Sequence, residues 1–246
     1  MLAAMAATLG VKVPEILPPL WHWTLFQEWL PPEGLGPDGH PRRGGFLPAL
    51  PELGRRMWAG GRVRFLCPLR AGDAVTRMST VTSIDEKIGR SGRLVFVTVH
   101  HTISGPSGPA ISEDQDLVYR GPDGPAVAPG EAMPNALYRP RGEVCPDPVL
   151  LFRYSALTGN GHRIHYDMDY ARTVEGYPGL VVHGPLQATL LAGLLRHPPG
   201  RFHYRGRRPA FHGEVLRLES WTHDDCTELR SRDPSGAVCM EAEAYP

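Results

Sequence analysis

Several side chains that carry protons or charge lie close together in the segment LTGNGHRIHYDMDYA, which runs from Leu157 to Ala171. These side chains belong to His162, Arg163, His165, Asp167 and Asp169. Histidine titrates near neutral pH, so an imidazole beside a substrate can accept or donate a proton under physiological conditions. The segment has three interpretations: an acid/base site, a metal site, or a polar turn without chemistry.

The spacing of His162 and His165 fits a metal-binding pair only if both lie on one helical turn and a third ligand is present. Gly159 and Gly161 in the same segment disfavour a helix. We therefore expect no metal site. In the alternative without chemistry, His162 caps a backbone group and His165 packs in the core.

A second segment, GLVVHGPLQATLL, places His183 and Gly184 directly before an apolar stretch. Leucines recur at helical spacing between Pro185 and His197, and a proline in the first turn is typical of a helix start. Backbone N–H groups at a helix N-terminus have no partner inside the helix and carry the positive end of its dipole. Because Gly184 permits close approach, this turn is suited to stabilising an oxyanion.

The composition indicates an ordinary globular protein without a global charge. The chain has 246 residues, of which 26 are basic and 26 acidic, and 41% are hydrophobic, which suits one large domain or two small ones. Zero net charge argues against nucleic-acid binding, and no apolar run is long enough for a membrane span. The four cysteines form no C-x-x-C pair, so a reducing cytoplasm is the expected location.

Two sets of strand-like segments surround the candidate residues. Residues 1–60 read as irregular chain with short helices, and β-branched runs then predict strands at 62–69, 73–88, 93–104 and 110–120. The sequence GRSG, residues 89–92, predicts a hairpin turn. After a stretch dense in Pro and Gly come a short helix at 167–176 and the long helix Pro185–His197. Further strands are predicted at 201–207, 213–222, 226–233 and 237–245.

This order of elements predicts an α+β fold with two antiparallel sheets, each wrapping a central helix. The stretch dense in Pro and Gly is the only one without sustained periodicity and indicates a linker. The expected organisation is therefore a first unit at 1–125, a linker at 126–147 and a second unit at 148–246.

The segment YSALTGNGHRIHYDMDYA, from Tyr154 to Ala171, resembles the (R)-specific enoyl-CoA hydratase motif of the MaoC-like hotdog family. That motif reads roughly Y-x-x-[LVI]-[ST]-G-D-x-N-P-[LIV]-H, followed by a small residue, and GLVVHGPL is similar to the family's turn into its central helix. PPLWHW, GPDGHPRRGGFLP, RRMWAGGRVRF and GRSGRLVFVTV resemble one branch of the family. This tandem-hotdog branch contains mesaconyl-CoA, itaconyl-CoA and methylfumaryl-CoA hydratases and type 2 3-hydroxyacyl-thioester dehydratases. The resemblance implies a double hotdog with a degenerate first half and a catalytic second half.

The resemblance also implies reversible hydration of a 2-enoyl thioester, with coenzyme A as the carrier part of the substrate and no other cofactor. The acyl group expected is short and branched or dicarboxylic, such as mesaconyl or itaconyl. In this scheme His165 activates water for attack at Cβ, Asn160 helps to hold that water, and the Gly184 N–H stabilises the thioester oxygen. A homodimer or higher homo-oligomer without nucleic-acid or membrane partners is expected.

One departure from the motif affects this scheme. Asn160 stands where the motif has its catalytic aspartate, and His162 and Arg163 stand where it has Asn-Pro. An amide is not a general base, although it can orient a water molecule. Either His165 therefore carries more of the work, or a following aspartate assists it.

Substrate contacts are predicted at seven positions. Arg163 is a candidate partner for a free carboxylate, or else for a structural salt bridge with Asp167 or Asp169. The arginines of RFHYRGRR are candidates for the CoA phosphates, or else charges on an exposed strand edge. The remaining six candidates are Tyr154, His162, His183, Arg205, Arg207 and Arg208.

Two other functions remain open at this point. A hotdog thioesterase would hydrolyse the thioester and typically uses an Asp or Glu near the helix. A non-catalytic acyl-thioester binding protein is compatible with the loss of the motif's aspartate, whereas the presence of His165 argues against it.

Overall fold

Nine strands form one antiparallel sheet in the computed structural model, which describes residues 1–89, 92–121 and 137–246. The sheet has the order β2-β3-β4-β1-β6-β9-β8-β7-β5. The strands are β1 (Arg55–Phe65), β2 (Thr76–Gly89), β3 (Gly92–Gly105), β4 (Gly108–Arg120), β5 (Arg139–Val144), β6 (Arg201–Gly206), β7 (Leu216–His223), β8 (Cys226–Arg232) and β9 (Val238–Tyr245). The α-helices are α1 (Leu2–Leu9), α2 (Pro148–Thr158), α3 (Met168–Thr173) and α4 (Gly184–Ala192). This is the predicted α+β class.

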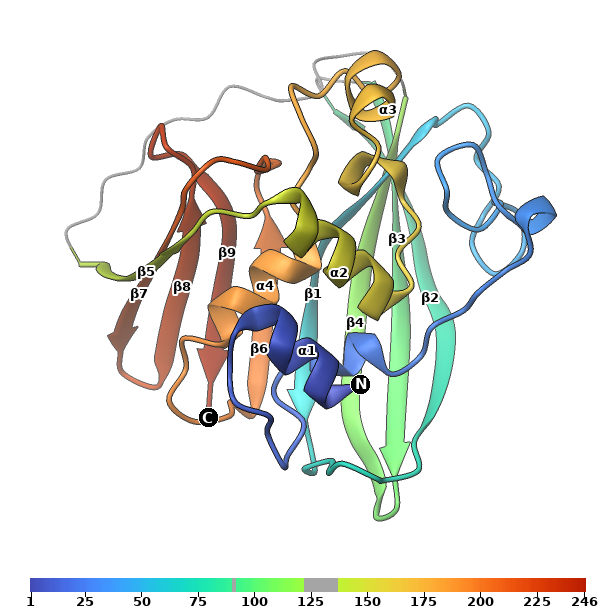
Figure 1. Ribbon diagram of the computed structural model, residues 1–246. Coiled ribbons are helices and arrows are strands. Elements are labelled where there is room, and N and C mark those ends of the chain that lie inside the picture. Colours follow the sequence, from blue (N-terminus) through green and yellow to red (C-terminus); the bar gives the residue numbers. More distant parts are fainter. Residues whose placement is uncertain (90–91, 122–136) are drawn as a thin grey trace.

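The two halves of the chain share this sheet through one strand pair. β1 pairs with β4 on one side and with β6 on the other, so that Gly60 lies opposite Arg205 and Arg64 opposite Arg201. The structure therefore differs from the predicted pair of sheets, because backbone hydrogen bonds continue across the seam between the halves. Figure 1 shows the long strands β2, β3, β4 and β1 on one side of this seam and the shorter strands on the other.

Helix α4 lies at the centre of the molecule and is buried on nearly all sides. Leu186, Ala188 and Leu191 are fully buried in it. One side packs against sheet residues of both halves, including Val63 and Phe202, and the other packs against α1 and α2. In Figure 1 these three helices lie across one face of the sheet. The leucine spacing of the sequence predicted this helix, although it ends earlier than His197.

In the part of the first half that the structure describes, no helix is wrapped by the strands as α4 is in the second half. The aromatic segment at residues 20–30 forms only the short 3₁₀ helix Trp21–Thr24, which begins after Leu20 in the left-handed region at φ 69°. Helix α1 is eight residues long and packs against α2 rather than under its own strands. The prediction of a central helix in each half is thus not met in this half.

The predicted linker at 126–147 is only partly a linker. Residues 126–136 lie outside the described residues, as do residues 90–91 of the predicted GRSG turn. Strand β5 falls within the predicted linker and pairs with β7, so that it belongs to the sheet of the second half. Helix α2 then starts at Pro148, where the Asp147 side chain accepts a hydrogen bond from Leu150 N at 2.7 Å. In the described part of the chain, no helix combines the length and apolar character of a membrane span.

Candidate active site

The end of α2 shapes the turn that carries the two motif histidines. Gly159 ends the helix in the left-handed region at φ 61°. The Asn160 side-chain oxygen then accepts a hydrogen bond from His162 N at 3.0 Å. This turn leads into the 3₁₀ helix Arg163–His165, which places the His165 ring against His183 at the start of α4 and the His162 ring beside His165. The Asn160 oxygen thus accepts one hydrogen bond in this turn, and its NH₂ group remains available for the predicted water.

His165 is held in one tautomer by the backbone. Its Nδ1 lies 2.7 Å from the Val181 carbonyl oxygen, and since a carbonyl only accepts, Nδ1 carries the proton and Nε2 the lone pair. Nε2 has no hydrogen-bond partner among the described residues and is not sealed from solvent. Burial lowers the pKa of His165 to about 4. The ring is therefore a neutral base at physiological pH.

A second imidazole supports His165 from behind. The His183 ring stacks on it with centroids 3.6 Å apart and an angle of 19° between the planes. His183 is completely buried, its Nε2 lies 2.8 Å from Ser155 Oγ, and burial holds its pKa well below the ordinary value. Tyr154 lies against His183 and is also buried, with its hydroxyl 3.3 Å from Thr189 Oγ1. Tyr154 and His183 thus pack behind His165, and their predicted contact with substrate stays a prediction.

The first half contributes two residues that sequence analysis missed, Asp38 and His40. The Asp38 carboxylate accepts hydrogen bonds from His40 N at 3.1 Å and from the His40 ring at 3.2 Å. The His40 ring lies against the His162 ring with centroids 4.2 Å apart. The only signal in the sequence was the resemblance of GPDGHPRRGGFLP to the tandem-hotdog branch.

Two loops from opposite halves meet at this point. Arg163 N donates a hydrogen bond to the Asp38 carbonyl at 2.9 Å. Gly39 and Gly161 pack so closely that a Cβ on Gly39 would lie 2.0 Å from the Gly161 carbonyl oxygen. Gly39 also adopts φ 85°, so two independent constraints require glycine there. The site is therefore assembled from both halves of the chain.

Arg163 is occupied by protein groups. Its guanidinium donates to Asp167 Oδ2 at 2.7 and 3.0 Å and to the Pro37 carbonyl at 3.2 Å. It also lies over the Tyr170 ring. The Arg163 guanidinium and the backbone N–H of Tyr170 lower the pKa of Asp167, the N–H being the larger cause. Of the two interpretations of Arg163, the structure therefore supports the salt bridge, which ties this segment to the loop of the first half.

Gly184 begins α4 directly beside the stacked imidazoles. Pro185 has no N–H, so the unbonded donors of the first turn come from Gly184 and Leu186. A Cβ on Gly184 would lie 2.5 Å from the Trp58 ring. Close packing against Trp58, in addition to the predicted approach of a substrate, thus accounts for glycine at this position.

Asp38, His40 and His162 also form a group whose possible ligand atoms all lie within 4.8 Å of one another. Two imidazoles and a carboxylate are donor types that zinc accepts. The pair considered from the sequence, His162 with His165, is not this group, which includes His162 but not His165. The expectation that the protein needs no metal stays a prediction.

The arginines proposed for the CoA phosphates do not converge. Arg207 pairs with Glu241, and Arg208 pairs with Asp233 at 3.0 Å. Arg205 is exposed and alternates with the buried Tyr204, so it faces away from the core. The alternative of an exposed strand edge is also wrong, because β6 lies between β1 and β9. These three residues give no support to a phosphate site.

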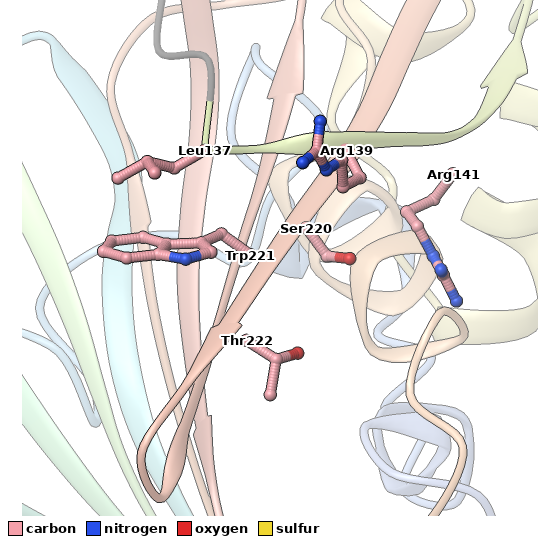
Figure 2. Close-up of a pocket in the computed structure, with 6 residues that line it drawn as sticks. All are labelled: Leu137, Arg139, Arg141, Ser220, Trp221 and Thr222. Atoms are coloured by element: carbon pink, nitrogen blue, oxygen red, sulfur yellow. The ribbon is translucent and has the colours of Figure 1, made fainter.

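Two surface hollows lie away from the histidines. The first has a volume of about 340 Å³, and Figure 2 shows its lining residues, in which Trp221 and its neighbours on β7 face Arg139 and Arg141 on β5. The second, of about 490 Å³, adjoins it between Arg141 and the C-terminal residues. Neither hollow is lined by His40, His162, His165 or His183, so we define the site by the contacts among these side chains.

Comparisons with known proteins agree on one family. The profile of hydroxyacyl-thioester dehydratase type 2 matches residues 20–212. The chain is 47% identical over 231 residues to mesaconyl-C(4)-CoA hydratase of Chloroflexus aurantiacus, covering 92% of this chain and 82% of that protein. It is 28% identical over 240 residues to the mitochondrial hydroxyacyl-thioester dehydratase type 2 of Schizosaccharomyces pombe, covering 86% and 79%.

Solved structures agree at the level of the fold. HtdX of Mycobacterium tuberculosis superposes with a TM-score of 0.72 at 18% identity, over 99% of this chain and 94% of that one. A second protein of that organism, described as a double hotdog, gives 0.55 at 14% identity, over 100% and 86%. The resemblance predicted from Tyr154–Ala171 is confirmed: the chain belongs to the hydroxyacyl-thioester dehydratase type 2 family of MaoC-like enzymes.

Proposed function

We propose that this enzyme catalyses the reversible hydration of a 2-enoyl-CoA thioester whose acyl group is a short, branched dicarboxylic chain of the mesaconyl type. Hydration and dehydration are the reactions named for the relatives in its family. The acyl group is inferred from the 47% identity to a mesaconyl-C(4)-CoA hydratase over most of both chains.

The observation that carries this proposal is the tautomer of His165. With Nδ1 bonded to the Val181 carbonyl, Nε2 is left as an unprotonated nitrogen without a partner among the described residues. A water molecule placed between this nitrogen and Cβ of the substrate loses its proton to Nε2 as its oxygen bonds to Cβ. A positioned base of this kind contributes on the order of 10²–10⁴-fold to the rate.

The start of α4 supplies the complementary charge. As water adds to Cβ, negative charge develops on the thioester oxygen, and the Gly184 N–H at the positive end of the helix stabilises it. Asn160 adds its amide group as a donor for the attacking water. Loss of one such oxyanion donor costs on the order of 10²–10³-fold in rate.

A dicarboxylic acyl group requires a cation for its free carboxylate, because a buried unpaired charge is costly. We assign this role to Arg56 on β1. It alternates with Met57 and so lies on the same face of the strand as Trp58, which contacts Gly184. The charge of Arg56 acts on the His162 and His40 imidazoles. Among the described residues Arg56 has no ion pair, unlike Arg163.

The finer architecture is part of the same proposal. We infer that the single sheet consists of two hotdog-like halves joined at β1 and β6, with the first half degenerate because it lacks a helix like α4 in its described residues. The superposition on a double hotdog supports this inference. A homo-oligomeric state, coenzyme A as the only carrier, and a cytoplasmic location stay predictions.

The test is to incubate the purified protein with a panel of CoA thioesters that includes mesaconyl, itaconyl, crotonyl and longer straight-chain enoyl groups. Product masses are then measured. We expect a gain of one water with the thioester intact, and the highest kcat/KM for the branched dicarboxylic substrate. Release of free thiol would indicate a thioesterase instead, and binding without turnover would indicate a non-catalytic binding protein.

A further inference from the structure

Three side chains that can bind a metal ion converge where the loops of the two halves meet. The candidate ligand atoms of Asp38, His40 and His162 all lie within 4.8 Å of one another. Zinc accepts two imidazoles and a carboxylate at bond lengths of about 2.0–2.2 Å, which place the ligand atoms of a tetrahedral ion roughly 3.3–3.6 Å apart. Small rotations of the three side chains are therefore enough to close the group around one ion.

The His162 ring has no other partner that would explain its position. His162 is only 9% exposed, and its backbone N–H is bonded to Asn160. Among the residues that the structure describes, no hydrogen bond reaches either nitrogen of its ring, whereas the neighbouring His165 and His183 rings each have a partner. The ring lies against His40, with centroids 4.2 Å apart. Because a buried polar group without a partner is costly, a metal ion shared with His40 would stabilise this arrangement.

Asp38 and His40 form the more open side of the group. One Asp38 oxygen accepts a hydrogen bond from His40 N at 3.1 Å, and the other lies 3.2 Å from His40 Nδ1. A carboxylate beside a metal-binding imidazole fixes the orientation of the ring and raises its basicity. The two side chains are each 21% exposed, so an ion can enter from solvent on this side.

Backbone contacts hold the ligands in place before any ion binds. Arg163 N donates to the Asp38 carbonyl oxygen at 2.9 Å. Gly39 and Gly161 pack backbone against backbone in the same contact. Side chains on two loops that are already joined lose little freedom when they bind an ion, which favours binding.

The surroundings select this group over others in the molecule. Within residues 1–89, 92–121 and 137–246 it is the only group of three or more His, Cys, Asp or Glu side chains that could hold an ion. The positive charge of Arg56 acts on both imidazoles and opposes a second cation, whereas the charge of Asp38 favours one. Three ligands and an opposing charge indicate a site weaker than a structural zinc site with four protein ligands.

We propose that Asp38, His40 and His162 bind one divalent cation of the zinc type, which joins the loop of the first half to the motif loop of the second. The fourth position is left to water. The role of the ion is structural, and no step of the hydration passes through it. It would also fix the His162 ring beside His165, whose ring centroid lies 5.5 Å away.

The experiment uses the full chain, made metal-free with a chelator and titrated with zinc chloride. Calorimetry should show one zinc per chain. Thermal unfolding should shift upward by roughly 5–10 °C at a zinc concentration about 100-fold above the dissociation constant. Magnesium at the same concentration should give no shift, because it prefers oxygen ligands.

Three variants connect the binding to the three side chains. His40→Gln and His162→Gln should lose the one-to-one binding, and Asp38→Asn should weaken it on the order of tenfold or more, since a charged ligand is lost. Without metal, Asp38→Asn should unfold close to the wild type, so that its loss of stability appears only when zinc is present.

A matched control is available on β3 and β4. His100 Nδ1 and Asp114 Oδ1 form a similar pair, 2.7 Å apart, that does not belong to the metal group, and His100→Gln should leave zinc binding unchanged. Absence of binding in the wild type would overturn the proposal. Binding that persists in both His40→Gln and His162→Gln would overturn it as well, in favour of zinc elsewhere, for example at the exposed Cys67 or Cys145.

A second measurement does not depend on the folding of any variant. Cobalt(II) bound to the wild-type protein should show the intense visible absorption bands of a four-coordinate ion, and zinc should displace it. Only the weak bands of a six-coordinate, hydrated ion would overturn the proposal. A protein that binds zinc in this way but hydrates none of the thioesters would refute the proposed function and leave the metal site intact.

Discussion

The chain contains two groups that combine histidine with a carboxylate in protected surroundings, and they differ in how fully the carboxylate is used. Glu113 is buried in the core and accepts hydrogen bonds from His22, Trp23 and Tyr204, each at 3.0 Å. Its pKa stays below the ordinary value although burial acts to raise it, because these donors and the charge of His22 favour the ionised form. The three donors His22 Nε2, Trp23 Nε1 and Tyr204 OH are all bonded to Glu113.

The group of Asp38, His40 and His162, by contrast, is partly exposed to solvent. Asp38 accepts hydrogen bonds from His40, and one face of the group reaches solvent. His162 and His165 are buried, and each keeps a ring nitrogen without a hydrogen-bond partner among the described residues. The comparison teaches that a carboxylate buried in the core and bonded to three side-chain donors contributes to stability, whereas a carboxylate in a group that is partly open to solvent is available for chemistry. Each prediction below tests one side of this distinction.

The largest effect is expected at His165. His165→Gln should lower kcat/KM on the order of 10²–10⁴-fold, because glutamine keeps polar contact with Val181 but offers no base. Steady-state kinetics with the preferred thioester measure this loss, and circular dichroism checks the fold. An activity loss of less than about tenfold in a folded variant would refute the assignment of His165 as the base.

The second effect concerns the contribution of Glu113 to stability. Glu113→Ala leaves three donors without an acceptor in the core and should lower the free energy of unfolding by about 3–5 kcal/mol. Asp38→Asn should lower it by less than about 1 kcal/mol, since Asp38 is partly exposed. Urea unfolding of both variants measures the difference. Similar losses in the two variants would remove the distinction between the groups.

The third effect concerns substrate choice. Arg56→Met should lower kcat/KM for mesaconyl-CoA on the order of 10²-fold more than for crotonyl-CoA, because only the former would leave an unpaired carboxylate in the site. Arg163→Met serves as the comparison, and equal losses on both substrates are expected because Arg163 ties Asp167 to the loop at Pro37. Selectivity lost in Arg163→Met but kept in Arg56→Met would reverse the assignment.

The fourth effect is a dependence of stability on pH. His165 is neutral in the folded protein, with a pKa of about 4, and titrates near 6.5 when unfolded. Between these values the unfolded chain binds more protons, so stability falls as pH decreases from about 6.5 to about 4. His165 alone accounts for about 3 kcal/mol, and the buried His183 adds to the fall. Urea unfolding across this range should show a shallower slope in His165→Gln, and an unchanged slope would contradict the buried, neutral ring.

Features encoded by a local pattern were predicted well from the sequence. The long helix and most strands of both halves lie where leucine spacing and β-branched runs predicted them. Helix α2 and strand β5 were not predicted, and the reason differs between them. The start of α2 directly follows a stretch dense in Pro and Gly, where Asp147 was interpreted as linker although it forms the N-cap of a helix that begins at Pro148. In β5, Pro140 and Gly142 interrupt the strand pattern, and pairing with β7 supplies what the local sequence lacks.

The candidate site was predicted in part. The motif pointed to His162 and His165, the segment GLVVHGPL pointed to Gly184, and Asn160 was recognised as the departure, while the roles of these residues stay predictions. Asp38 and His40 were missed because no periodicity connects a turn near residue 40 with one near residue 162. Their contact depends on Gly39 packing against Gly161, a feature that only the folded chain reveals.

The contact between the loops near residues 40 and 162 also determines when the enzyme becomes active during folding. The hydrogen bond from Arg163 to the Pro37 carbonyl joins residues 126 positions apart in the chain. Loop closure over such a distance carries a large entropic cost, and contacts of this kind slow folding. Hairpins such as β2–β3 can form from local chain alone, whereas the imidazole group forms only when both halves have docked. During refolding, recovery of catalysis should therefore lag behind recovery of the circular dichroism signal, so that a chain still emerging from the ribosome has strands but no working site.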